Sequence, residues 1–179
     1  MTAARPLSAS QARVWRLPAD VDTDALAPGH AMKHGMETIA RHCLETLRPE
    51  FAGAVQRGDV LVAGANFGIG SSREQAASVL VALGVAAVIA PSFGGLYFRN
   101  AFNVGLLLLT CDQANALLEG ERIAFDAGAA RITRASGERL ACQPIAPFLL
   151  DMAGAGGLLS QLQQRISSSE RKPNEQTPL

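Results

Sequence analysis

Three consecutive polar residues, Ser71, Ser72 and Arg73, stand directly after a glycine-rich segment that covers residues 64–70. An apolar run typical of a strand leads into this segment, and a pattern typical of a helix leads out of it. A loop in this position presents backbone N–H groups to an anion, and the planar guanidinium of Arg73 matches a carboxylate bidentately. A serine oxyanion at the same place would be stabilised by the helix terminus and the N–H donors. We therefore predict a site for a carboxylate-bearing substrate.

The glycine spacing differs from two common phosphate-binding motifs. A Walker loop requires the lysine of GxxxxGK[ST], and this segment has no lysine. Gly68 and Gly70 begin a GxGxxG pattern, but Arg73 occupies the place of the third glycine. A structural alternative is a capping box, in which Ser71 caps the next helix and Glu74 bonds back to it. The pattern by itself leaves both the cap and the substrate site open.

The composition limits the classes of partner. The chain has 179 residues, enough for one domain, and its 16 basic and 16 acidic residues balance, so we expect neither nucleic acid nor an anionic membrane as a partner. No apolar run is long enough to span a membrane and no signal-peptide pattern is present, so we expect a cytoplasmic location. Cys43, Cys111 and Cys142 form no CxxC pair. We therefore expect reduced, packed thiols and no metal site on this chain.

Strand and helix patterns alternate over residues 59–109. Strands are expected at residues 59–63, 85–90 and 105–109, and helices at residues 75–83 and 96–102. This order predicts a β-α-β-α-β unit whose parallel strands are joined by right-handed crossovers.

The rest of the chain adds a second, smaller set of elements. We expect a strand at residues 12–17, an amphipathic helix at 36–47, an antiparallel patch of strands at 122–125, 131–133 and 138–142, and helices at 148–152 and 158–166. Residues 1–10 are expected to form a flexible lead-in, residues 11–166 one domain, and residues 167–179 a disordered tail.

The glycine-rich segment, with the order Gly64-x-Asn66-Phe67-Gly68-x-Gly70-Ser71-Ser72-Arg73-Glu74, resembles the signature of the aconitase swivel domain. The closest form is the stand-alone small subunit of 3-isopropylmalate dehydratase. Other stretches that resemble this family are DTD at residues 22–24 followed by Pro28, HCLE at 42–45, PEF at 49–51, AVIA at 87–90, FRN at 98–100 and GGL at 156–158. The resemblance covers about residues 12–166.

The resemblance implies an α/β fold: a single swivelling β/β/α-type domain with a mixed, partly parallel sheet. It also implies a heteromeric hydro-lyase of leucine biosynthesis, in which this chain binds no cofactor. A separate large subunit would hold a 4Fe-4S cluster that acts on the substrate as a Lewis acid. The substrate would be a small dicarboxylate or tricarboxylate.

Carried over position by position, the resemblance assigns roles to individual residues. Ser71 corresponds to the base that removes the carbon-bound proton, and Ser72 and Arg73 correspond to ligands of the substrate carboxylate. Asp24 matches the acidic residue of the family's first loop, which reaches the same site. Gly68 and Gly70 would form the anion-binding loop. These roles agree with the chemistry of the loop, because a serine needs an electropositive setting to act as a base.

The chain departs from the family pattern at two places, and the second of them lies in the loop that is expected to set specificity. Gln75 replaces the usual histidine after the Arg-Glu pair, and residues 29–35, GHAMKHG, replace an aromatic-Leu pattern. Lys33 could contact a polar or anionic substituent of the substrate, whereas His30 and His34 could equally be solvated loop residues. We expect no function for His42, which lies on the polar side of its helix.

These departures leave the substrate open. It could be 3-isopropylmalate or another 2- or 3-substituted malate, of the homoaconitate or dimethylmalate type. A different class of function also remains, a non-catalytic anion-binding regulatory module in which Ser71 is only a helix cap.

Overall fold

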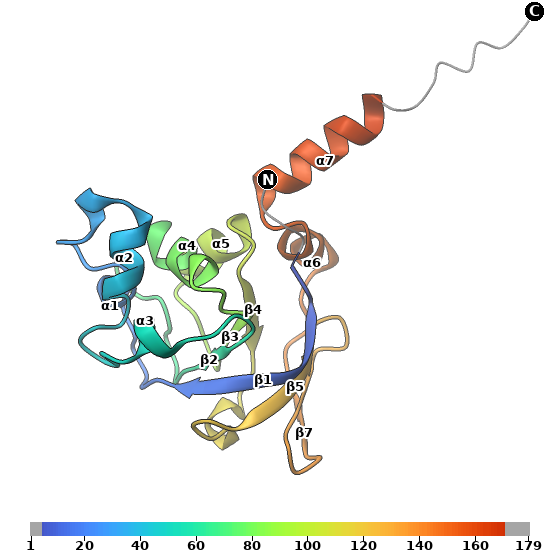
Figure 1. Ribbon diagram of the computed structural model, residues 1–179. Helices are drawn as coiled ribbons and strands as arrows, with labels where there is room; N and C mark the ends of the chain where they lie inside the picture. The colour runs from blue at the N-terminus through green and yellow to red at the C-terminus, as the bar shows by residue number, and fades with distance from the viewer. Residues whose placement is uncertain (1–4, 171–179) are drawn as a thin grey trace, which may run out of the picture.

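The computed structural model describes residues 5–170, and these residues form one mixed sheet with helices packed around it (Figure 1). The seven strands lie in the order β4-β3-β2-β1-β5-β6-β7. Their bounds are β1 Ser8–Arg16, β2 Val60–Val62, β3 Ala87–Ala90, β4 Leu107–Thr110, β5 Arg122–Asp126, β6 Arg131–Thr133 and β7 Arg139–Ala141. The helices are α1 Thr23–Leu26, η1 Met32–His34, α2 Met36–His42, α3 Phe51–Ala54, α4 Gln75–Ala82, α5 Gly95–Asn103, η2 Ala114–Ala116, α6 Pro147–Gly154 and α7 Leu158–Glu170, where η denotes a 3-10 helix.

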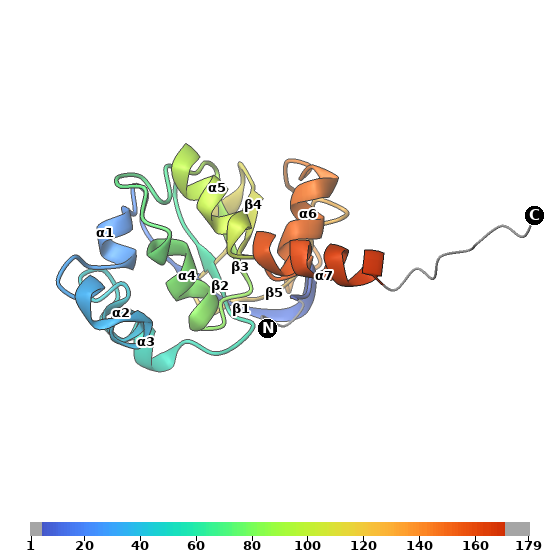
Figure 2. The ribbon, with the colours of Figure 1, turned by 90° about the horizontal axis from the view of Figure 1, so that it is seen from above.

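Strand β1 joins the two halves of the sheet. It pairs in parallel with β2, with Val14 opposite Val60, and antiparallel with β5, with Ala12 opposite Ile123. The strands β2, β3 and β4 are parallel, and α4 and α5 connect them on the same side of the sheet (Figure 2). The predicted β-α-β-α-β unit, the antiparallel patch and the α/β class are therefore confirmed.

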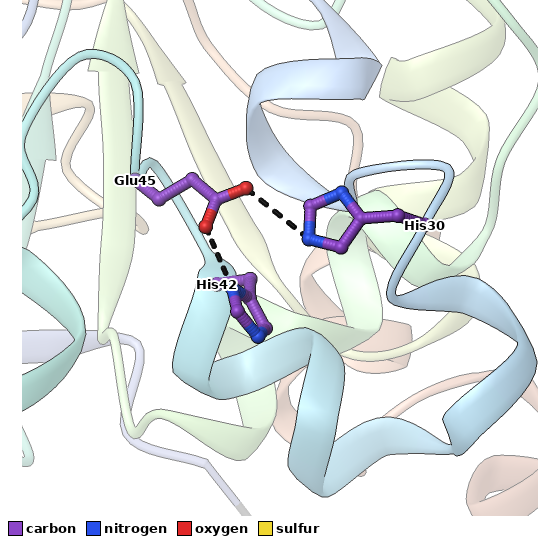
Figure 3. Close-up of side chains that lie close together, drawn as sticks. All are labelled: His30, His42 and Glu45. Carbon is purple, nitrogen blue, oxygen red and sulfur yellow. Dashed lines mark hydrogen bonds and ion pairs between the residues drawn. The ribbon is translucent and has the colours of Figure 1, made fainter.

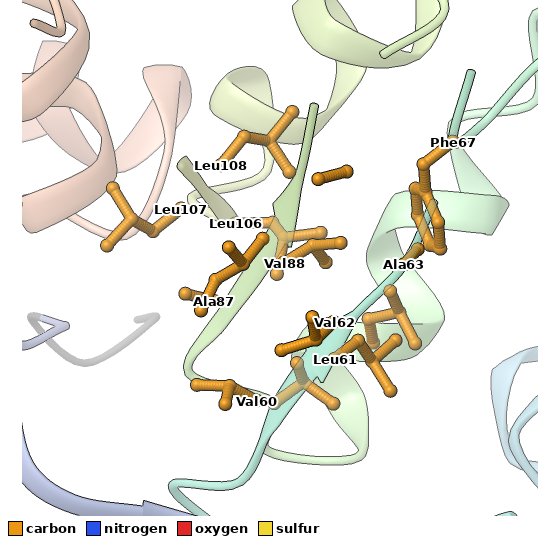
Figure 4. Packing of buried hydrophobic residues seen from close by; sticks show 14 of the residues in the cluster. Val60, Leu61, Val62, Ala63, Phe67, Ala87, Val88, Leu106, Leu107 and Leu108 are labelled. Carbon is orange, nitrogen blue, oxygen red and sulfur yellow. The ribbon is translucent and has the colours of Figure 1, made fainter. Parts of the chain in front are cut away.

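The parallel strands lie in the centre of the core. Every residue of β2 and β3 is fully buried, and both strands read as continuous apolar runs (Figure 4). This pattern is typical of parallel strands that are covered on both faces. Each buried Val or Leu side chain stabilises the fold by about 1.5–3 kcal/mol relative to exposure, so the strands form a rigid base for the loops that follow them.

The helix predicted over residues 36–47 is wrong at its end. Helix α2 ends at His42, because Leu44 adopts a left-handed backbone conformation with φ 61°. The Leu44 N–H donates to Ala25 O at 2.8 Å, and its side chain is fully buried. Leu47, which was expected on the buried face, is 39% exposed. The chain thus turns back at Leu44 instead of continuing the helix.

Two terminal boundaries also differ from those expected. Strand β1 begins at Ser8, so residues 8–10 of the predicted lead-in are strand. Helix α7 continues to Glu170, so residues 167–170 of the predicted tail are helical, and residues 171–179 lie outside the described residues. None of the helices within residues 5–170 is long and apolar enough to cross a membrane. All three cysteines are free thiols and buried.

Candidate active site

The glycine-rich loop lies beside the segment that follows β1. Strands β1 and β2 are parallel, so the chain leaves both of them at the same edge of the sheet. Four backbone hydrogen bonds join the two segments, from Gly64 N to Pro18 O (3.1 Å), from Asp20 N to Ala65 O (2.8 Å), from Gly68 N to Val21 O (2.7 Å) and from Thr23 N to Ile69 O (2.9 Å). This pairing brings residues that are far apart in the sequence to one edge of the sheet.

The two loop glycines have different roles. Gly68 has φ 79°, and a Cβ atom there would lie 2.1 Å from the Tyr97 ring, so only glycine lets the loop pack against α5. Its N–H donates to Val21 O and therefore faces the protein, so the contribution of Gly68 to the predicted anion loop is to shape the backbone. Gly70 has φ 102°, and its N–H has no hydrogen-bond partner within residues 5–170. Of the two glycines, Gly70 alone keeps an N–H available for an anion.

Ser71 and Ser72 are exposed, and their hydroxyl groups form no hydrogen bond to the described part of the chain. The capping-box alternative is wrong. Helix α4 begins at Gln75, and its N-cap residue Glu74 has a helical backbone without a side-chain capping bond. Ser71 instead belongs to a turn, in which its carbonyl accepts from Arg73 N at 2.8 Å. The Ser71 hydroxyl therefore has no structural role as a cap.

Arg73 and Asp24 come together as the sequence predicts. Arg73 Nη1 donates to the Asp24 carboxylate and to Ala27 O, the latter at 3.1 Å. Helix α1, which carries Asp24, is capped by Asp22, whose carboxylate accepts from Ala25 N at 2.7 Å. The other guanidinium nitrogens of Arg73 have no partner among the residues that the structure describes. Arg73 is thus oriented through one nitrogen and keeps free donors for a carboxylate.

One polar group near the loop was missed by the sequence reasoning. Thr23 Oγ1 is buried, has no hydrogen-bond partner in residues 5–170, and lies where a Cβ atom on Gly70 would approach it to 3.2 Å. The threonine belongs to the DTD segment, so its position in that motif was the available signal.

Comparisons with known proteins place this geometry in a family. The profile described as the aconitase C-terminal domain matches residues 31–114. The 3-isopropylmalate dehydratase small subunit of Moorella thermoacetica is 40% identical over 153 residues, which are 84% of this chain and 92% of that protein. The chain belongs to the family of 3-isopropylmalate dehydratase small subunits. This family provides hydro-lyase subunits of the aconitase superfamily, so the predicted family and enzyme class are confirmed.

Two further relatives bear on the fold and on specificity. A crystal structure of 3-isopropylmalate dehydratase from Methanocaldococcus jannaschii superposes with a TM-score of 0.83 and 33% identity, over 90% of this chain and 98% of that one. The methanogen homoaconitase small subunit of Methanothermobacter thermautotrophicus is 37% identical over 159 residues, 87% of this chain and 92% of that protein. Relatives with two different substrate names are thus similarly close to this small subunit.

The segment that departs from the family pattern contributes one histidine to a pocket beside Asp24. The pocket has a volume of about 370 Å³, and the residues that line it include Asp24, Pro28, Gly29, His30 and Glu45. Lys33 is exposed in η1 and is not among the described residues that line this pocket. The proposed contact of Lys33 with substrate therefore stays a prediction.

The structure also brings together three residues that the sequence reasoning had set apart. His30, His42 and Glu45 lie close together (Figure 3), and His30 and Glu45 also line this pocket. The sequence left His30 open as a substrate contact or a solvated residue and predicted no function for His42, and it gave no indication that the two rings are in contact. The His-x-x-Glu spacing of residues 42–45 was a signal for two of the three.

Proposed function

We propose that this small subunit, with an iron-sulfur large subunit, dehydrates and rehydrates a substituted malate, with 3-isopropylmalate as the first candidate. The observation that carries the proposal is the state of the loop: an exposed Ser71 hydroxyl without a partner stands beside Arg73, which keeps free guanidinium donors. Relatives that carry the 3-isopropylmalate name support this substrate class, and with it a role in leucine biosynthesis.

In this proposal Ser71 removes the carbon-bound proton. The ordinary pKa of a serine hydroxyl is far too high for this, so the alkoxide must be stabilised by nearby donors and positive charge. The free N–H of Gly70 and the guanidinium of Arg73 are the groups of this chain that supply both. Asp24 orients the guanidinium through one nitrogen, so that the others can bind the substrate carboxylate together with Ser72.

The leaving hydroxyl needs a Lewis acid, which the large subunit's 4Fe-4S cluster would supply. Cysteine thiolates hold such a cluster, whereas the three cysteines of this chain are widely spaced in the sequence and are all buried. Burial raises the pKa of Cys43 well above its ordinary value, which disfavours the thiolate that a metal requires. These properties support placing the cluster on the partner, and the task of this chain is to bind and deprotonate the substrate.

Of the two alternatives, a different substrate is compatible with the site, whereas a non-catalytic module is less well supported. A homoaconitate-type or dimethylmalate-type substrate fits the same chemistry and is supported by the homoaconitase relative and by His30 at the pocket. The alternative of a non-catalytic regulatory module assumed that Ser71 is only a helix cap, and this assumption fails because Ser71 does not cap α4.

The test is an anaerobic reconstitution of the full chain with the iron-sulfur large subunit of the same organism. The substrates are 3-isopropylmalate, a dimethylmalate and a homoaconitate-type tricarboxylate. We expect turnover from the complex and none from either subunit alone, with the highest kcat/KM identifying the substrate. A complex that assembles, carries its cluster and turns over none of the three would contradict the proposal.

A further inference from the structure

We infer that His30, His42 and Glu45 form a binding site for one divalent transition-metal ion of the zinc class. His30 Nε2 lies 3.3 Å from Glu45 Oε1, and His42 Nδ1 lies 2.6 Å from Glu45 Oε2 (Figure 3). The imidazole rings meet edge to face, with centroids 4.9 Å apart. The candidate ligand atoms all lie within 4.8 Å of one another. The site shares His30 and the pocket beside Asp24 with the proposed substrate site, but metal binding by these residues does not require the proposed reaction.

The backbone fixes the three residues from two sides. His42 is the last residue of α2, and the left-handed turn at Leu44 directs Glu45 back toward it, with Glu45 N donating to His42 O at 3.2 Å. The buried Leu44 side chain and its hydrogen bond to Ala25 O anchor this turn to α1. The segment between α1 and η1 brings His30 to the same place. The ligands are thus held before any ion binds.

The ligand types and spacings suit zinc better than magnesium or calcium. Two imidazoles and one carboxylate, with an open fourth position, form a common zinc set and also a set for other first-row metals. Ligand atoms at about 2.0–2.1 Å from a tetrahedral ion are separated by about 3.3 Å. The His30–Glu45 pair already has this separation. His42 contacts the other carboxylate oxygen, Oε2, so the Glu45 carboxylate must turn for one of its oxygens to bind an ion together with both imidazoles. Magnesium and calcium prefer sites built from oxygen ligands.

The surroundings of the cluster are also suited to a cation. His30 and Glu45 line the pocket of about 370 Å³ that also includes Asp20 and Asp22, whose carboxylates add negative charge, whereas the nearby Asp24 is paired with Arg73. The side chains of His30, His42 and Glu45 are 59%, 39% and 33% exposed, so an ion can enter from solvent. The pocket therefore offers both a route of entry and room for a water or ligand at the open position.

The direct test is a titration of the untagged full chain with Co²⁺, followed by visible absorption, and a competition with Zn²⁺. We expect one ion per chain, and an affinity that falls in acid, because protons compete with the metal for its ligands. His42→Gln and Glu45→Gln should each weaken binding at least tenfold, and Zn²⁺ should raise the Tm of the wild type but not of these variants.

The chain supplies matched controls. It contains three histidines, and His34 is exposed in η1 outside the cluster, so His34→Gln should keep the wild-type affinity. Cys142→Ser should also keep it, which excludes Cys142 as a ligand. Circular dichroism verifies that each variant is folded. The inference is overturned if the wild type binds no Co²⁺ or Zn²⁺, if His42→Gln and Glu45→Gln bind as tightly as the wild type, or if either control loses the same affinity.

Discussion

Two carboxylate–arginine pairs lie at opposite ends of the parallel strands, and they are built in different ways. Asp59 stands immediately before β2 and pairs with Arg13 at 2.6 Å, whereas Asp24 and Arg73 lie beyond the other ends of β1 and β2. The Asp59 side chain is 5% exposed and the Asp24 side chain 62%. One pair is part of the core, and the other is open to a ligand.

The hydrogen bonds explain the difference. Asp59 accepts from Arg13 Nε and Nη2, from the Trp15 ring N–H at 2.8 Å and from Gln56 N at 2.9 Å. Arg13 and Arg48 also lie over the Trp15 ring, 4.8 and 5.1 Å from its centroid. Burial by itself would raise the pKa of Asp59, but the hydrogen bonds from Arg13, Trp15 and Gln56 outweigh it and lower that pKa. The Asp59 carboxylate thus has its hydrogen-bond partners within the protein, whereas Arg73 and Ser71 keep polar groups that are free to bind substrate.

Ser71→Ala should produce the largest effect, and this effect should be on turnover and not on stability. Loss of a general base lowers turnover by a factor of about 10²–10⁴. The hydroxyl has no partner within residues 5–170, so the Tm should remain that of the wild type. The measurements are kcat of the reconstituted complex and thermal unfolding of the isolated chain. A stability loss of about 0.5–2 kcal/mol with nearly normal turnover would instead indicate a cap.

Asp59→Asn should have the opposite effect, a loss of stability without a loss of turnover. The substitution removes the negative charge to which Arg13 and the Trp15 ring N–H donate hydrogen bonds. It should therefore lower the free energy of unfolding by about 1–3 kcal/mol. Below the Tm, kcat should stay at the wild-type value, because the pair is remote from the loop edge. Asp24→Asn is the matched control, with a small effect on urea unfolding and a large one on kcat/KM. Equal stability losses in the two variants would remove the distinction.

The stabilising effect of Asp59 should also depend on pH. The pKa of Asp59 lies below its ordinary value of 3.8 in the folded protein, so its stabilising contribution is complete above about pH 4 and is lost as the pH falls through the lower folded value. The difference in unfolding free energy between wild type and Asp59→Asn should therefore shrink below about pH 4 and stay constant from about pH 5 to 7. A difference that is independent of pH down to about pH 2 would show that the charge of Asp59 is not what stabilises the fold.

Lys33→Leu should have the smallest effect. Lys33 is exposed and lies outside the residues described as lining the pocket, so we expect a shift of a few-fold in the kcat/KM ratio toward an alkyl malate over a carboxyalkyl malate. His34→Gln, its exposed neighbour in η1, is the control and should leave the ratio unchanged. An unaltered ratio in Lys33→Leu would place the specificity elsewhere in the loop, with His30 as the next residue to vary.

The sequence was informative where local pattern and structure agree. The apolar runs of β2, β3 and β4 need to be buried on both faces, so the parallel unit follows from composition and order. The meeting of Asp24 and Arg73 was predicted only through the family resemblance, because no local pattern pairs residues 49 positions apart.

Three features could not be predicted because they depend on tertiary contacts. The alternation in β1 does not reveal its partners, which proved to be β2 on one side and β5 on the other. Leucine rarely takes a positive φ, so the turn at Leu44, which ends α2 and directs Glu45 toward His42, has no signal in the sequence. The S-x-x-E pattern of residues 71–74 favoured a cap, but the loop holds Ser71 in a turn before the helix begins.

The most direct test of the account makes the same chemical change on both sides of the comparison, Arg73→Lys and Arg13→Lys. A lysine keeps the charge but loses the planar donor set in each case. We expect Arg73→Lys to lower kcat/KM of the reconstituted complex by about 10–100-fold, since hydrogen bonds to charged groups contribute about 1.5–3 kcal/mol. Its free energy of unfolding should fall by less than about 1 kcal/mol, because the pair with Asp24 is exposed to solvent. Arg13→Lys should lower the free energy of unfolding and leave kcat/KM unchanged. The account is contradicted if Arg73→Lys destabilises the fold and turns over substrate at the wild-type rate.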